Sequence, residues 1–165
     1  MNCPEMSKED CEFMEEKFSQ IKQFYFNDCK LSSLERLPNF PHVIKIEMCS
    51  NKIKIGLASF ARYPMLSALK LRSNRIDSFE ELEALNAVKL LTELDLVGNP
   101  IVQRDDYRKQ VYHTIKNLQI LDLKTKQDTR EIDSEHMSDE DADIPQAISE
   151  DEDENRVFVK DTGYW

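Results

Sequence analysis

The feature that most constrains the fold of this chain is a pattern of apolar residues that returns along most of its length. The template L-x-x-L-x-L-x-x-(N/C)-x-L occurs four times at steps of 22 to 27 residues, and a shortened fifth copy follows. The copies begin at Ile21, Val43, Leu66, Leu91 and Leu118. A period of this length is the sequence signature of stacked structural repeats, each of which buries its apolar face against its neighbours.

Each copy predicts one coil of a solenoid. Apolar residues at alternate positions, such as Leu69 and Leu71, indicate a short strand with one face in the core, so that stacked copies form a parallel sheet on the concave side. Apolar residues at three-residue steps between the strands, such as Leu57, Phe60 and Tyr63, favour helical or 3₁₀ turns on the convex side. The fold class is therefore α/β, a leucine-rich repeat solenoid.

One polar position of the template has a structural role of its own. Its side chain lies where the coil turns inward and can satisfy backbone groups that would otherwise be buried without partners. The residues at this position are Cys29, Asn51, Asn74 and Asn99.

A solenoid also needs its two ends covered. Residues 1–20 are predicted to form an N-terminal capping helix, because Ser7 and Asp10 resemble an N-cap arrangement and Cys11, Met14 and Phe18 follow at helical spacing. Residues 21–127 form the repeat domain, and its last part is a capping helix in which Tyr107, Val111 and Ile115 share one face. Leu123 is predicted to be the last core position of the fifth copy.

Charge is distributed unevenly along the chain. The whole sequence has a net charge of −10. Residues 1–127 hold 18 acidic and 19 basic side chains, a net charge of +1, whereas residues 128–154 hold 13 acidic side chains and only Arg130 as a base, a net charge of −12. We expect residues 128–165 to be a disordered acidic tail, because the acidic stretch offers too few apolar residues to form a core.

The acidic stretch carries the second set of candidate functional residues. These residues are Asp139, Glu140, Asp141, Asp143, Glu150, Asp151, Glu152, Asp153 and Glu154. Ser138 and Ser149 directly precede acidic runs and are candidate phosphorylation sites, where a phosphate would add to the existing negative charge. The tail ends in apolar residues, Val157, Phe158, Val159, Tyr164 and Trp165, which either pack back on the body or serve as a free docking peptide.

The first set of candidates lies between the strand leucines. Side chains alternate along a strand, so these residues point to the concave surface. We call the following set the concave polar face: Tyr25, Asn27, Lys45, Glu47, Lys70, Arg72, Glu93 and Asp95. A face of mixed charge with one aromatic residue is better suited to a protein partner than to nucleic acid.

The end of the repeat domain resembles a known cap. The segments Gly98-Asn99-Pro100 and Asp106-Tyr107-Arg108, followed by Leu118, Leu121 and Asp122, resemble the C-terminal cap of SDS-type leucine-rich repeat proteins. With the acidic stretch that follows, the chain resembles the acidic leucine-rich nuclear phosphoprotein 32 family. This tail departs from the family pattern, because it is short, is interrupted by Ile144 to Ile148, and lacks a basic nuclear-import cluster after the acidic tract.

The resemblance implies a function. It implies binding of histones and other basic proteins, chromatin-linked chaperoning, inhibition of a serine/threonine phosphatase, and a nuclear location with exchange to the cytoplasm. Another function remains open: an assembly adaptor that grips one folded partner through the concave surface, as the spliceosomal A-prime protein or an axonemal dynein light chain would.

Several other functions are not expected. An acidic chain does not favour binding to duplex nucleic acid or to an anionic membrane. The histidines have no evident nucleophile partner and the three glycines form no phosphate loop, so we expect no enzyme activity, no cofactor and no metal site. Glu80, Glu81 and Glu83 are predicted to be a solvated convex edge. We expect a monomer.

Overall fold

The computed structural model describes residues 7–127 and 156–158 of the chain. Its strands form one seven-stranded sheet in the order β6-β5-β4-β3-β2-β1-β7. The repeat strands are β1 (Gln23–Tyr25), β2 (Lys45–Glu47), β3 (Ala68–Lys70), β4 (Glu93–Asp95) and β5 (Ile120–Leu121), and each pairs with the next in parallel. β6 (Lys124–Thr125) is antiparallel to β5, and β7 (Arg156–Phe158) is parallel to β1. The predicted leucine-rich repeat solenoid is confirmed.

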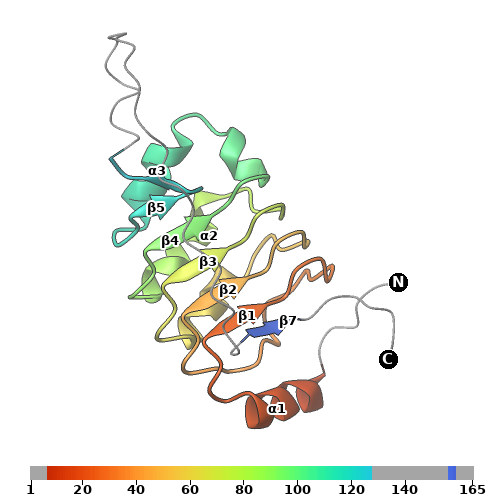
Figure 1. The fold of residues 1–165 in the computed structure, drawn as a ribbon. Helices are drawn as coiled ribbons and strands as arrows, with labels where there is room; N and C mark the ends of the chain where they lie inside the picture. The colour runs from red at the N-terminus through yellow and green to blue at the C-terminus, as the bar shows by residue number, and fades with distance from the viewer. Residues whose placement is uncertain (1–6, 128–155, 159–165) are drawn as a thin grey trace, which may run out of the picture.

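The helical segments cover the opposite side of the sheet and its two ends (Figure 1). The convex side carries the 3₁₀ helices η1 (Leu57–Arg62) and η2 (Ala84–Ala87) and the short helix α2 (Phe79–Glu83). The 3₁₀ helix η3 (Pro100–Gln103) leads into α3 (Tyr107–Thr114) at one end, and α1 (Lys8–Lys17) lies at the other. The core lies between the two layers and holds the inward leucines of every copy, such as Leu69, Leu94 and Leu121, with no exposed surface.

The asparagine position connects neighbouring coils as the template predicts. The amide nitrogen of Asn74 donates to the carbonyl oxygens of Met48, at 2.8 Å, and Leu71, at 2.9 Å, while its amide oxygen accepts from the backbone nitrogen of Ile53 at 3.0 Å. Asn51 and Asn99 make equivalent bonds, and all three side chains are buried. Each amide therefore satisfies backbone groups of two coils at once.

The turn that precedes this position has a left-handed backbone in all four full copies. The φ angles are 55° at Asp28, 57° at Ser50, 56° at Ser73 and 76° at Gly98. A Cβ at Gly98 would lie 3.1 Å from the Oγ of Ser73 in the preceding coil. Glycine at position 98 therefore adopts the left-handed backbone without strain and leaves room for Ser73 of the preceding coil.

The N-terminal cap forms but is loosely packed. Ser7 and Asp10 make a reciprocal capping box, with the Asp10 backbone nitrogen 3.1 Å from the Ser7 Oγ and the Ser7 nitrogen 3.0 Å from the Asp10 carboxylate. α1 buries none of its residues fully, and Met14 is half-buried against the core. Phe18, which follows Cys11 and Met14 at helical spacing, lies just after the end of α1 and is exposed, as is Phe13.

The C-terminal cap is tied to the last full repeat by Asp122. One carboxylate oxygen accepts from the Leu96 backbone nitrogen at 2.8 Å, and the other accepts from the Tyr107 hydroxyl at 3.0 Å. Burial, together with the Asp122 carboxylate, raises the pKa of Tyr107 well above its ordinary value. The cap residues that the sequence singled out therefore meet at one point.

Leu123 is not the core residue that the fifth repeat copy predicted. Asp122 and Leu123 both have left-handed backbones, with φ of 54° and 65°, and the chain turns there into antiparallel β6. The turn leaves the Leu123 side chain 67% exposed. A hairpin at this point replaces the inward turn of a full repeat.

Part of the predicted tail is a strand. Residues 156–158 pair with β1, so for these three residues the structure differs from the expected disorder and favours packing back on the body. The acidic candidates Asp139 to Glu154, the serines Ser138 and Ser149, and the final residues 159–165 lie outside the described residues.

Candidate functional site

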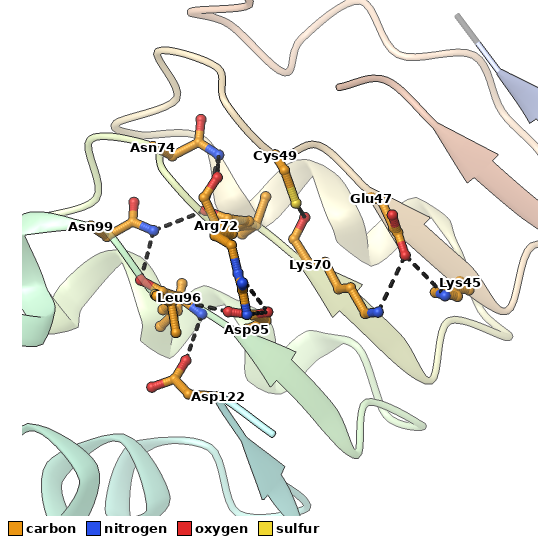
Figure 2. A network of polar contacts seen from close by, with 12 residues as sticks. Lys45, Glu47, Cys49, Lys70, Arg72, Asn74, Asp95, Leu96, Asn99 and Asp122 are labelled. Atoms are coloured by element: carbon orange, nitrogen blue, oxygen red, sulfur yellow. Dashed lines mark hydrogen bonds and ion pairs between the residues drawn. The ribbon is translucent and has the colours of Figure 1, made fainter. Parts of the chain in front are cut away.

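The concave polar face is held by residues of four neighbouring strands and the turns that follow them. Gln23, Lys45, Ala68 and Glu93 stand in register at the first strand position, and Tyr25, Glu47, Lys70 and Asp95 at the third. Because stacked coils repeat the same geometry, residues far apart in sequence become cross-strand neighbours. Figure 2 shows how this brings acidic and basic side chains of adjacent coils together.

Glu47 lies between two lysines. Its Oε1 is 2.9 Å from the Nζ of Lys45 and 3.3 Å from the Nζ of Lys70. Burial by itself would raise the pKa of Glu47, but the hydrogen bonds and charges of the two lysines outweigh it and lower that pKa. All three side chains are half-buried and their charges are paired with one another, so this triad offers little free charge to a partner.

A second ion pair joins Arg72, in the turn after β3, to Asp95 at the end of β4. The Nε and Nη2 of Arg72 lie 3.2 and 2.9 Å from the Oδ2 of Asp95. The hydrogen bond and charge of Asp95 raise the pKa of Arg72 above its ordinary value. The Arg72 side chain is 44% exposed, whereas the Asp95 side chain is only 4% exposed. The pair thus leaves the guanidinium accessible and hides the carboxylate.

Two other predicted residues have structural roles. Tyr25 is 5% exposed, and its hydroxyl is bonded to Gln23 while the Lys45 ammonium lies 5.7 Å from the centre of its ring. Asn27 accepts a bond from the Cys49 backbone nitrogen at 2.7 Å. The expected aromatic contact surface is therefore not available at Tyr25.

Glu93 differs from the other acidic residues of the face. It is half-exposed at the start of β4, and within residues 7–127 and 156–158 no side chain forms an ion pair with it. The accessible charges of the concave polar face are thus Arg72 and Glu93.

The last two coils also carry apolar side chains that are not fully buried. Val97 follows β4 and is exposed, Leu123 is exposed at the hairpin, and Ile120 on β5 is half-buried. All three belong to the last two coils. Alternation along the strands predicts Val97 and Ile120 on the concave surface. Sequence reasoning missed only Leu123, because the hairpin turn that exposes it has no signal in the repeat template.

The convex side also holds an acidic residue that is not merely solvated. The Oε2 of Glu81 on α2 accepts from the backbone nitrogens of Gly56, at 2.8 Å, and Leu57, at 3.2 Å. Glu81 therefore caps the N-terminus of η1 in the preceding coil, which corrects the prediction of a solvated edge at this residue.

The described residues contain no cluster of three histidine, cysteine, aspartate or glutamate side chains that could hold a metal ion. No helix in the same part of the chain has the length and hydropathy needed to cross a membrane. The chemistry on the concave surface is that of ion pairs, hydrogen bonds and apolar contacts, which serves recognition of a partner.

Comparison with known proteins agrees with a recognition role. A family model described as leucine-rich repeat matches residues 11–148. A histone of Tetrahymena thermophila is 33% identical over 112 residues, which cover 67% of this chain and 29% of that protein. Acidic leucine-rich nuclear phosphoprotein 32 family member A of Drosophila melanogaster is 30% identical over 107 residues, which cover 65% of this chain and 41% of that protein. The chain therefore spans less than half the length of these curated relatives.

Solved structures give the same fold. A chain of the Drosophila melanogaster SNF/U2A′ complex aligns with a TM-score of 0.61 at 25% identity, covering 69% of this chain and 67% of that one. The Mex67 leucine-rich repeat domain of Chaetomium thermophilum aligns with a TM-score of 0.55 at 18% identity, covering 76% of this chain and 99% of that one, and shows the fold alone. The resemblance to acidic leucine-rich nuclear phosphoprotein 32 proteins is confirmed as sequence similarity. The chain belongs to the leucine-rich repeat family.

Proposed function

We propose that this leucine-rich repeat protein binds basic proteins, histones first among them, and that the acidic residues 128–154 supply most of the attraction. One observation carries this proposal. On the concave polar face, Glu47 is neutralised by Lys45 and Lys70, and the buried carboxylate of Asp95 by Arg72. Residues 1–127, with a net charge of +1, therefore have little negative charge to offer, while residues 128–154 carry −12.

The proposed binding is non-catalytic and electrostatic. Opposite charge raises the association rate, and salt screens the attraction. The names of the relatives, which include nuclear phosphoproteins and a histone, support a nuclear location and a chromatin-linked chaperone role. Phosphorylation at Ser138 and Ser149 would strengthen the same attraction by adding negative charge.

A matched pair of full-length chains tests the proposal. In one, Glu150, Asp151, Glu152, Asp153 and Glu154 become the corresponding amides; in the other, Glu9, Glu12, Glu16, Glu80 and Glu83 on α1 and α2 become glutamine. Both variants lose five negative charges. We expect the first to bind a purified core-histone dimer at least about tenfold more weakly than the intact chain, and the second to bind within about twofold. Equal losses in both would assign the effect to total charge and contradict the proposal.

A second candidate function is that of an assembly adaptor. The similarity to a chain of the SNF/U2A′ complex favours it, together with the exposed apolar side chains of Val97, after β4, and Leu123, in the hairpin after β5. An adaptor would grip one folded partner through the last two coils, with apolar anchors surrounded by charge. Neutralising the acidic residues would leave such binding intact, and Val97→Asp would abolish it.

Regulation of a serine/threonine phosphatase is a third function, which rests on the resemblance. The intact chain added to a purified phosphatase at a range of concentrations would show inhibition that saturates. Activity that stays constant over that range would remove this function.

A further inference from the structure

Strand β7 closes one edge of the sheet with residues from the far end of the chain. Gln23 pairs with Arg156, Phe24 with Val157 and Tyr25 with Phe158, in parallel. Without β7, β1 would be the outermost strand of the sheet, as the strand order and Figure 1 show. An outer strand presents unpaired backbone groups and is a template for another extended segment.

The register makes β7 resemble a repeat strand. Phe24, Ile46, Leu69, Leu94 and Leu121 stand in one column across the sheet, and Val157 takes the next place in it. In sequence, Val157-Phe158-Val159 has the same apolar-x-apolar pattern as Leu94-Asp95-Leu96. The asparagine position of the template, however, falls on Thr162. Residues 156–158 therefore fit the edge of β1 as a strand, but the sequence after them lacks the asparagine found in the second, third and fourth copies.

Chain topology brings both ends of the acidic segment to one side of the sheet. β6 is antiparallel to β5 and so runs back towards the edge where the repeat strands begin, and β7 starts at that same edge because it is parallel to β1. Six strand steps separate β6 from β7, which is roughly 29 Å at about 4.8 Å a step. A random coil of about 28 residues, the length of segment 128–155, spans about 30 Å.

The match between these two lengths favours an intramolecular contact. Effective concentration is highest when the average span of a linker equals the distance between the two sites, and it then reaches the millimolar range. Three paired residues make a weak interaction by themselves. The pairing of β7 with β1 therefore depends on the linker and is open to competition.

We propose that the outer edge of β1 is a docking site for one extended segment, filled by residues 156–158 in the free protein. The partner that fits it is a peptide with the apolar-x-apolar pattern of β7, which adds to β1 as a parallel strand. When such a peptide displaces β7, the acidic segment is held at one end only. Binding of a partner to the edge of β1 is thus coupled to release of one end of the acidic segment.

Val157→Pro tests the proposal, because proline cannot donate to a strand ladder. Its control is Ala147→Pro, which places the same change in the connecting segment. Hydrogen exchange followed by mass spectrometry should show the amides of Gln23 and Tyr25, which lie on the β7 side of β1, exchanging at least about tenfold faster in Val157→Pro than in the intact chain, with no change in Ala147→Pro. A fluorescent peptide with the sequence of residues 153–163 should bind Val157→Pro at least about tenfold more tightly than the intact chain.

Three results would overturn the proposal. The first is unchanged exchange in β1 together with no peptide binding to Val157→Pro. The second is equal peptide affinity for the intact and Val157→Pro chains, which would place the peptide elsewhere. The third is a sedimentation measurement in which the intact chain is a dimer and Val157→Pro is a monomer. That result would mean that another copy of the chain fills the edge. Urea unfolding of both proline variants checks that they fold. If Val157→Pro does not fold, Val157→Asp replaces it, because a charge in register with Phe24 and Ile46 also disfavours docking.

Discussion

Both guanidinium nitrogens that face Asp95, the Nε and Nη2 of Arg72, donate to one carboxylate oxygen across the step from β3 to β4. The other oxygen of Asp95 accepts from the Val97 backbone nitrogen at 3.1 Å. A side chain that the sequence places on a recognition surface therefore also fixes the turn after β4. Its substitution affects folding as well as binding.

The Arg72–Asp95 pair should show measurable coupling. Arg72→Met leaves a buried carboxylate without its cation, whereas Asp95→Asn keeps an acceptor for the Val97 nitrogen. Because Arg72 is partly exposed, we expect a coupling free energy of about 0.5 to 1 kcal/mol in a double-mutant cycle of urea unfolding, and less at 1 M salt. Additive losses of the two single substitutions would show that the pair does not stabilise the fold.

The asparagine position should dominate the stability of the solenoid. Asn74→Ala removes the bonds to Met48, Leu71 and Ile53 and leaves buried backbone groups of two coils unpaired. We expect the free energy of unfolding to fall by at least about 2 kcal/mol. Asn39→Ala, at an exposed asparagine, is the control and should change it by less than about 0.5 kcal/mol. Similar losses in the two variants would argue against the role of the amide position.

The Tyr107–Asp122 bond should secure the C-terminal cap. Tyr107→Phe removes only the hydroxyl and should cost about 1 kcal/mol, whereas Asp122→Ala also frees the Leu96 nitrogen and should cost about 2 kcal/mol or more. Thermal unfolding of both variants shows which substitution destabilises the protein more. If Tyr107→Phe proved the more destabilising, the Asp122 carboxylate would not be the group that holds the cap.

The Glu47 triad should contribute a pH-dependent part of the stability. Lys45 and Lys70 lower the pKa of Glu47 in the folded protein despite its burial, so the carboxylate stabilises the fold above its unfolded pKa. That stability is lost as the pH falls through the lowered folded value. We therefore expect Glu47→Gln to be less stable than the intact chain at pH 7, by about 1 kcal/mol or less, and the gap to close below about pH 4. Urea unfolding at several pH values measures this gap, and a gap that persists at about pH 3 would mean that the charge of Glu47 is not its source.

Much of the fold is predictable because its determinants are local and periodic. The inward position of Leu94, the bridging role of Asn74 and the capping pair Ser7–Asp10 all follow from short spacings that the sequence displays. The exposure of Leu123 is not predictable in this way, because it depends on two left-handed residues that end the repeat. The pairing of Val157 with Phe24 is not predictable either, since it joins segments far apart in sequence.

The sequence predicts which residues lie on the concave side but not how exposed each side chain is. Alternation along each strand places Tyr25 and Asp95 on the concave side. Whether such a side chain meets solvent depends on its neighbours in adjacent coils: Lys45 lies over the Tyr25 ring and Arg72 covers Asp95. Those contacts form only when the coils stack. Of the eight residues expected to contact a partner, only Arg72 and Glu93 therefore offer an accessible charge.

The salt dependence of histone binding tests the central claim most directly. The dissociation constant for a purified core-histone dimer would be measured from about 50 to about 300 mM salt for the intact chain and for the chain with residues 150–154 changed to amides. We expect the Kd of the intact chain to rise steeply with salt and that of the neutralised chain to rise much less, so that the two converge at high salt. Parallel curves of equal slope would contradict the claim that the acidic segment supplies the attraction.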